Sequence, residues 1–194
     1  MSVDASRYDR VAIALHWAIA LAVLAQIGLG LWMIEIPKQP AGVRAYWFNL
    51  HKSIGLTLAL LIVVRLAWRL THRPPPLPAG LPRWQQLAAR VNHRLLYLCM
   101  IVMPSSGYLG SNFSGYPIKY FGTTLPAWAA KDDALKELLS AVHWSAAWLF
   151  VALIALHVAA AFKHLLAGDG IFARIWPAAA PAARRAGEGL TAGR

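Results

Sequence analysis

The sequence has little charge for its length. Only 14% of its 194 residues are charged, with eight Asp and Glu in all, whereas 58% are hydrophobic. A soluble domain of this size carries far more charge, because it must present a polar surface to water. The shortage of charged side chains therefore favours a membrane protein over a soluble one.

Cysteine is also nearly absent. The chain has one cysteine, Cys99, so it cannot form an internal disulfide. A single cysteine also excludes a CxxCH attachment site, so any prosthetic group would be held without covalent bonds to the chain. We expect Cys99 itself to pack as a small buried hydrophobic residue.

Four apolar runs are each long enough to cross a bilayer, which takes about 20 residues in a helix. They cover residues 11–33, 50–68, 91–110 and 142–166. Only a helix satisfies its own backbone hydrogen bonds within a single segment in hydrocarbon. The first run is longer than a signal-peptide core and no small-residue cleavage site follows it, so we expect it to be retained. The predicted fold is all-α, an integral membrane four-helix bundle forming one domain over residues 1–176.

Positive charge is concentrated on one side of this predicted bundle. The stretch between the second and third runs and both ends of the chain are rich in Arg, whereas the other two loops balance Lys and Arg against Asp and Glu. Basic loops remain in the cytoplasm, so the N- and C-termini are predicted to be cytoplasmic. The net charge of +11 is thus explained by topology, and we expect membrane lipid and no nucleic acid as a partner. Residues 177–194 are predicted to form a disordered cytoplasmic tail.

Four histidines lie within or at the edge of the apolar runs, where an ionisable side chain is costly and marks a functional site by default. His143 and His157 share a helix face, because fourteen residues at 100° each fall 40° short of four turns, and they lie about 21 Å apart along the axis. His51 begins the second run at its outer end, and His16 lies near the inner end of the first. Depth therefore pairs His51 with His143 and His16 with His157.

Two imidazoles on facing helices can ligate one metal from both sides, and haem is the obvious candidate. Such ligation leaves no open coordination position and favours electron transfer. Zinc is disfavoured because no carboxylate or thiolate completes a tetrahedral site. Two alternatives remain: a histidine-based transporter without haem, and ordinary hydrogen bonding of each histidine within the bundle.

Other polar residues near the inner side are candidates for cofactor binding. Arg65 lies fourteen residues after His51 and could pair with a haem propionate, or extend to the inner surface. His93 opens the third run and is the rival of His16 as inner ligand. His93, Arg94 and His164 could line a quinone pocket, and His93 and His164 could instead bond a propionate or lie at the membrane interface.

Several short motifs together resemble the bacterial cytochrome b561 family, which is related to the hydrogenase b-type cytochromes. The resemblance covers about residues 7–176. It is carried by Arg7-Tyr8-Asp9-Arg10, Leu15-His16-Trp17, Gly28-Leu29-Gly30, His51-Lys52-Ser53-Ile54-Gly55, Arg65-Leu66-Ala67-Trp68-Arg69, His93 before Tyr97, Met103-Pro104, and His143 with Leu156-His157 and His164.

This resemblance implies two b haems, ligated by His16 with His157 and by His51 with His143, in a multi-pass protein of the bacterial inner membrane. The short four-helix form with a proline-rich inner loop is most similar to the branch that acts as a superoxide:ubiquinone oxidoreductase. That branch implies electron passage from superoxide at the periplasmic face to ubiquinone. An alternative is a membrane-anchor subunit that relays electrons between quinone and a periplasmic redox protein docked on the 111–139 loop.

Superoxide is an anion, so an electropositive outer mouth would speed its capture. Lys52, Lys119 and Arg44 are the candidates for this mouth. Each is alternatively an anchor at the membrane interface. No catalytic residue is otherwise indicated by the sequence.

Overall fold

The computed structural model describes residues 7–40, 42–76 and 80–177. Each of the four predicted spans lies within one helix of the structure, and residues 178–194 of the predicted tail lie outside the described residues. The elements in chain order are helices α1 (Arg10–Met33), α2 (Val43–Thr71) and α3 (Arg83–Asn112), strands β1 (Lys119–Tyr120) and β2 (Thr123–Thr124), helix α4 (Asp133–Ala167), and the 3-10 helix η1 (Phe172–Arg174).

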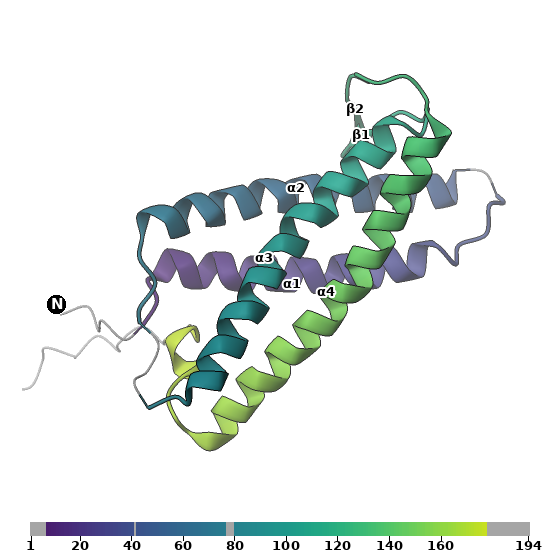
Figure 1. Cartoon of the computed structure of the whole chain (residues 1–194). Coiled ribbons are helices and arrows are strands. Elements are labelled where there is room, and N and C mark those ends of the chain that lie inside the picture. Colours follow the sequence, from purple (N-terminus) through teal and green to yellow (C-terminus); the bar gives the residue numbers. More distant parts are fainter. Residues whose placement is uncertain (1–6, 41, 77–79, 178–194) are drawn as a thin grey trace, which may run out of the picture.

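The helices form two antiparallel hairpins, α1 with α2 and α3 with α4, and the second hairpin crosses the first at an angle (Figure 1). Between the hairpins, α2 packs against α3, whereas α4 makes almost no close backbone contact with α1 or α2. We call the end where α1 begins and α4 finishes the terminal end. The opposite end, which carries residues 34–42 and 113–132, is the loop end.

Side-chain caps determine where two of the helices begin. Asp9 accepts a hydrogen bond from the amide of Ala12 at 2.8 Å, and Asp132 accepts one from the amide of Leu135 at 3.0 Å. An Asp at this position satisfies a backbone donor that the first turn leaves free. The sequence suggests a separate short helix over residues 129–139, but the cap at Asp132 instead starts α4, which continues without a break to Ala167.

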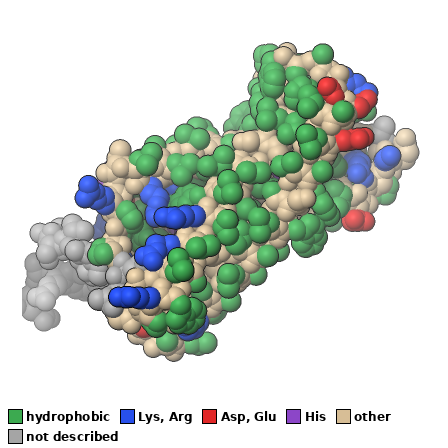
Figure 2. All heavy atoms as spheres, in the orientation of Figure 1, with side chains coloured by type: hydrophobic (Ala, Val, Ile, Leu, Met, Phe, Trp, Pro, Cys, Tyr) green, Lys and Arg blue, Asp and Glu red, His purple; other side chains and the backbone are tan. Residues whose placement is uncertain are grey.

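The outer surface of the helices is apolar over most of its length. Helices α1, α2 and α4 are long and apolar enough to cross a membrane, whereas α3 has Arg83, Arg90 and Arg94 in its first half and does not meet the same measure. Large hydrophobic side chains are exposed along all four helices. Figure 2 shows the Lys, Arg, Asp and Glu side chains gathered toward the two ends, with hydrophobic side chains between them. This distribution is the one expected of helices surrounded by hydrocarbon.

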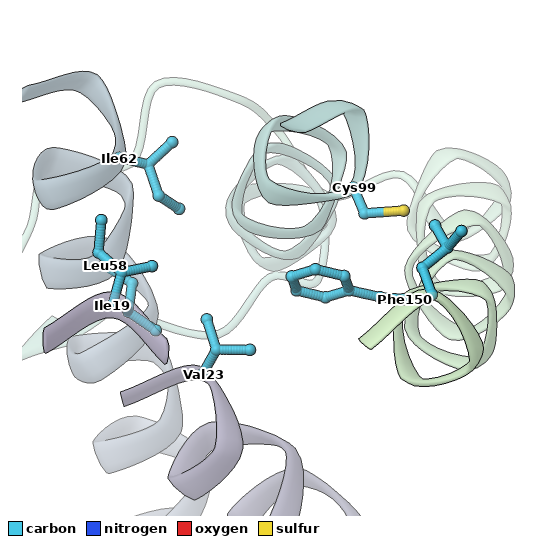
Figure 3. Packing of buried hydrophobic residues seen from close by; sticks show 7 residues of the cluster. Ile19, Val23, Leu58, Ile62, Cys99 and Phe150 are labelled. Carbon is cyan, nitrogen blue, oxygen red and sulfur yellow. The ribbon is translucent and has the colours of Figure 1, made fainter. Parts of the chain in front are cut away.

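A small apolar core joins the two hairpins at mid-length. Its buried members include Val23 from α1, Ile62 from α2, Cys99 from α3 and Phe150 from α4 (Figure 3). Cys99 is thus a packed apolar residue, as its position in the third run suggests. Phe150 lies seven residues from both His143 and His157, so its ring occupies the same stripe of α4 midway between them.

At the loop end, the β1–β2 hairpin is attached to α2 through one buried hydroxyl. Ser53 is 1% exposed, and its Oγ accepts a hydrogen bond from the amide of Phe121 at 2.9 Å. The same Oγ lies 3.1 Å from the carbonyl oxygen of Lys119 and 2.8 Å from that of Asn49. Because Ser53 follows His51 by two residues, the hairpin is fixed close to that histidine.

We predict that Ser53→Ala loosens the β1–β2 hairpin. The substitution leaves the Phe121 amide without its acceptor, and a lost buried partner costs about 1–3 kcal/mol. Hydrogen exchange should show faster exchange at Phe121 and along residues 119–124. Ser140→Ala is the matched control, because Ser140 bonds only to the carbonyl of Lys136 in its own helix; equal exchange in both variants would contradict the prediction.

Candidate functional site

The first histidine pair lies toward the loop end. His51 from α2 and His143 from α4 face each other with their ring centroids 6.4 Å apart and their planes at 77°. Helices α2 and α4 make almost no close backbone contact, so the two rings meet between the hairpins through their side chains. The depth pairing inferred from the sequence is therefore the pairing that this geometry presents.

The ring of His143 is oriented by α3. Its Nδ1 donates to the carbonyl oxygen of Met103 at 3.0 Å and lies 3.1 Å from the hydroxyl oxygen of Ser106. A Cβ added to Gly107 would lie 3.2 Å from the Cε1 atom of His143. Bonding at Nδ1 selects the tautomer that leaves Nε2 free as a ligand. The sequence alone does not predict these contacts, because Met103, Ser106 and Gly107 are far from His143 along the chain.

His51 has a glycine beside its ring but no hydrogen-bond partner at Nδ1. A Cβ on Gly30 would lie 3.2 Å from Cε1 of His51, so the close approach of α1 requires glycine there. The Nδ1 atom of His51 is buried and has no partner among the described residues. Gln26 bonds to the backbone oxygen of His51, not to its ring. An orphaned buried nitrogen of this kind indicates a group that the chain itself does not supply.

The second histidine pair lies toward the terminal end. His16 from α1 and His157 from α4 have ring centroids 6.2 Å apart with their planes at 59°. His16 is held from the side by Trp17, whose indole donates to the carbonyl oxygen of Ile175 at 2.9 Å. Both pairs thus take one histidine from α4 and the other from the first hairpin.

His93 also approaches this second pair. Its ring centroid lies 5.1 Å from that of His157, and its Nδ1 donates to the carbonyl oxygen of Ala89 at 2.6 Å. Unlike His16, it is exposed on the outside of the described bundle. The structure therefore brings together the three histidines that the sequence suggests as ligands at the inner side.

Arg65 lies at the inner side, as its position fourteen residues after His51 suggests, and is next to His16. Its guanidinium lies 3.4 Å from Nδ1 of His16 and donates to the carbonyl oxygen of Ala12 at 3.3 Å. The side chain therefore points into the bundle and lines a cavity of about 460 Å³ at the terminal end. Arg94, by contrast, is exposed on α3 and does not line this cavity.

His164 is hydrogen-bonded to a carboxylate just beyond the second histidine pair. Its Nδ1 lies 2.5 Å from a carboxylate oxygen of Asp169, which follows the end of α4. The hydrogen bond from His164 holds the pKa of the Asp169 carboxyl below its usual value. This carboxylate is a partner that the sequence analysis did not identify, and its short spacing from His164 was the available signal.

The three cations suggested for the outer mouth all lie at the loop end, but in different settings. Lys52 follows His51 on α2, and Lys119 is exposed on β1. Arg44 is committed to the backbone, because its guanidinium donates to the carbonyl oxygens of Ile34 and Ile36. Of the three, Lys52 and Lys119 are therefore the cations whose side chains are not committed to backbone carbonyls in the described part of the chain.

Comparison with known proteins gives a consistent match over most of the chain. Residues 7–178 match the family described as prokaryotic cytochrome b561. "Cytochrome b561 homolog 2" of Escherichia coli (strain K12) is 38% identical over 164 residues, covering 81% of this chain and 84% of the relative. "Probable superoxide oxidase CybB" of Yersinia pestis is 26% identical over 174 residues, covering 88% and 96%.

The family match extends over all four helices and includes every histidine of the two pairs. The Escherichia coli relative is similar enough, over enough of both chains, to support the same assignment independently. The chain belongs to the prokaryotic cytochrome b561 family, whose members are helical membrane proteins that bind b-type haem and transfer electrons.

Proposed function

We propose that this protein binds two b haems, one between His51 and His143 and one between His16 and His157, and transfers electrons across the bacterial inner membrane. The observation that carries the proposal is the facing arrangement of two histidine pairs, one toward each end of the apolar core. The N- and C-termini would then lie in the cytoplasm, because the basic segments meet at the terminal end.

The ring separations would allow both histidines of a pair to hold one metal ion. Two metal–nitrogen bonds of about 2 Å, added to about 1.1 Å from each nitrogen to its ring centre, would place the two ring centres about 6.2 Å apart. The observed 6.4 Å and 6.2 Å agree with this value. The 5.1 Å between His93 and His157 is too short for the same arrangement, which favours His16 over His93 as the inner ligand.

The surroundings of the rings also fit a bound macrocycle. The glycine neighbours of His51 and His143 let the adjacent helices approach both rings closely, which would help to hold the imidazoles in one orientation toward a bound group. Almost no close backbone contact joins α4 to α1 or α2, so the facing histidines lie where these helices are not packed backbone to backbone. We assign Arg65 to a propionate of the inner haem, since a guanidinium binds a carboxylate well.

When bound, haem supplies an iron that changes its charge by one electron. The histidines would hold that iron from both sides and so exclude oxygen as a ligand. Ser106 and the Met103 carbonyl would keep His143 in the ligating tautomer. The chain would thus hold the iron, orient the histidine rings and exclude oxygen as a ligand. The apolar core separates the two histidine pairs.

We infer that the electron donor is superoxide at the loop end and that the acceptor is ubiquinone at the terminal end. The name of the Yersinia pestis relative supports the donor. Lys52 and Lys119 would attract the anion to the region of His51. In the balanced reaction, two superoxide ions lose one electron each to give two dioxygen molecules, and ubiquinone takes two electrons and two protons to give ubiquinol.

We place ubiquinone near His164, His93 and Arg94. His93 is exposed toward the membrane beside His157, so a quinone in the lipid could approach it. His164 is paired with Asp169, which faces the terminal end and could return a proton to the imidazole after each transfer. Both histidines would thus act as proton donors to the reduced quinone.

A relay between quinone and a periplasmic redox protein is the second candidate. The observation that favours it is a group of exposed aromatic side chains at the loop end, including Tyr116 and Phe121, which are 77% and 61% exposed. Aromatic residues are enriched in protein interfaces. This candidate requires a partner, and the purified chain alone would have little activity with superoxide.

We predict that each histidine of the two pairs is needed for one haem. His51→Ala or His143→Ala should remove one of two haems, and His16→Ala or His157→Ala the other, because one imidazole cannot hold the group from both sides. Haem per chain, measured as pyridine haemochrome on purified protein, gives the result directly. Reduced-minus-oxidised spectra identify which haem remains.

His93→Ala and His72→Ala are the matched controls. His72 stacks on Trp68 at the terminal end and belongs to neither pair. Both variants should keep two haems. If His93→Ala loses a haem while His16→Ala keeps both, the inner pair is wrongly assigned; if the wild-type protein binds none, the electron-transfer mechanism fails.

We also predict that Lys52→Gln with Lys119→Gln slows reduction by superoxide. Loss of electrostatic attraction should lower the rate by about tenfold at low ionic strength and by less in salt. Ubiquinol formation by purified protein supplied with superoxide is the measurement. Lys131→Gln is the control, because Lys131 is already paired with Asp133.

Two outcomes would contradict the superoxide assignment. The first is haem reduction no faster than spontaneous dismutation allows. The second is full activity only after a periplasmic protein is added, which would favour the relay. Equal rates for the Lys variants at all ionic strengths would remove only the proposed role of the loop-end cations.

A further inference from the structure

The cavity at the terminal end is lined by an excess of positive charge. It lies among the start of α1, the last turns of α2, Tyr97 of α3 and residues 72–75, and has a volume of about 460 Å³. Figure 2 shows basic side chains gathered at this end of the molecule. Its charged lining is Arg7, Arg65, Arg69 and Arg73, with Asp9 as the single carboxylate.

These arginines are not neutralised by the described part of the chain. No carboxylate lies within 4.0 Å of any of the four guanidinium groups there. Asp9 is already used by the Ala12 amide and the Trp68 indole, and Arg69 lies over the ring of Tyr97 at 5.5 Å. Cations that are grouped in a cavity at a membrane surface favour an anionic ligand.

A separate apolar groove lies near this cavity, along the seam between α2 and α3. It has a volume of about 110 Å³ and is lined by Ala59, Val63 and Leu66 of α2 and by Met100, Ile101 and Pro104 of α3, among others. Leu66 lies three residues from Arg69, and Met100 three residues from Tyr97, so the groove begins about one helical turn from the cavity.

The groove is open to the surrounding membrane. Val63 is 61% exposed and Ile101 is 48% exposed, and both lie on its walls. A ligand that occupies the whole seam must therefore have a negative head and a hydrocarbon tail. Ubiquinone has the tail but a neutral head, which would leave Arg69 and Arg73 without a counter-ion, since the haem propionate is assigned to Arg65.

We propose that the α2–α3 seam binds an anionic phospholipid, with its phosphate in the arginine cavity and an acyl chain along the apolar groove. Arg69 and Arg73 lie toward the exposed side of the cavity and bind the phosphate. Arg65 lies deeper, against His16, and remains available to the haem propionate. The lipid site does not depend on the identity of the electron donor or acceptor.

The test measures binding of phosphatidylglycerol to the purified, haem-containing protein after delipidation in detergent. Native mass spectrometry should show one retained phosphatidylglycerol per chain and weaker retention of phosphatidylcholine. Arg69→Gln with Arg73→Gln should weaken phosphatidylglycerol binding by about tenfold or more, since each basic residue near an anionic lipid contributes to affinity. Arg83→Gln with Arg90→Gln is the control, because both residues lie at the terminal end outside the cavity.

Two further arms separate the lipid from a free phosphate group. Ala59→Phe, which fills the groove, should weaken binding of phosphatidylglycerol, whereas neither inorganic phosphate nor glycerol 3-phosphate should displace the lipid at concentrations well above its own. Displacement by either would mean that the site binds a phosphate group without a tail and would overturn the proposal. So would equal affinities for phosphatidylglycerol and phosphatidylcholine.

Haem content of each variant is measured in parallel. If Arg69→Gln with Arg73→Gln retains phosphatidylglycerol but loses haem, these arginines bind propionates and the lipid assignment is wrong. Retained haem with lost lipid supports the proposal. Comparison of the absorption spectra shows that each variant is folded around its haems.

Discussion

A polar side chain in hydrocarbon must find its partner inside the protein, and this requirement organises the centre of the bundle. His143 reaches the Met103 carbonyl on the neighbouring helix, and Arg65 reaches the carbonyl of Ala12. Neither group can turn to solvent at these depths without a large free-energy penalty. The histidines therefore point inward, and the helices that carry them are fixed in rotation as a consequence.

The facing histidines come from three of the four helices, and the fourth supports them. Helix α3 carries neither member of the facing pairs, yet it orients His143 and packs closely along α4. Helix α4 carries one member of each pair, and α1 and α2 carry one of the opposing members each. Both pairs thus lie at the junction between the hairpins, where direct backbone packing is sparse.

Periodicity and depth along the sequence predicted the helices and the pairing of the histidines, because both depend on local spacing. The same reasoning placed Arg65 at the inner side, whereas its contact with His16 is seen only in the structure. It left His16 and His93 as rivals, since only the ring separations distinguish two histidines at one depth.

Contacts between distant segments were beyond this reasoning. Phe121 of the β1–β2 hairpin bonds to Ser53, and His143 contacts Ser106. In each case the two residues are more than thirty positions apart along the chain. The local sequence pattern does not specify which serine will contact the hairpin or the histidine. The start of α4 at Asp133 was missed for a different reason: a capping aspartate is a local signal, but turn residues before it suggested a separate element.

The packed layer around Phe150 has an electrical consequence. The described side chains of this layer are apolar and closely fitted, so they offer no hydrogen-bonding groups along which a proton could move. Electrons that cross between the histidine pairs would therefore travel without compensating protons. Each inward transfer, completed by proton uptake at the terminal end, would charge the membrane negative on that side and store free energy as a transmembrane potential.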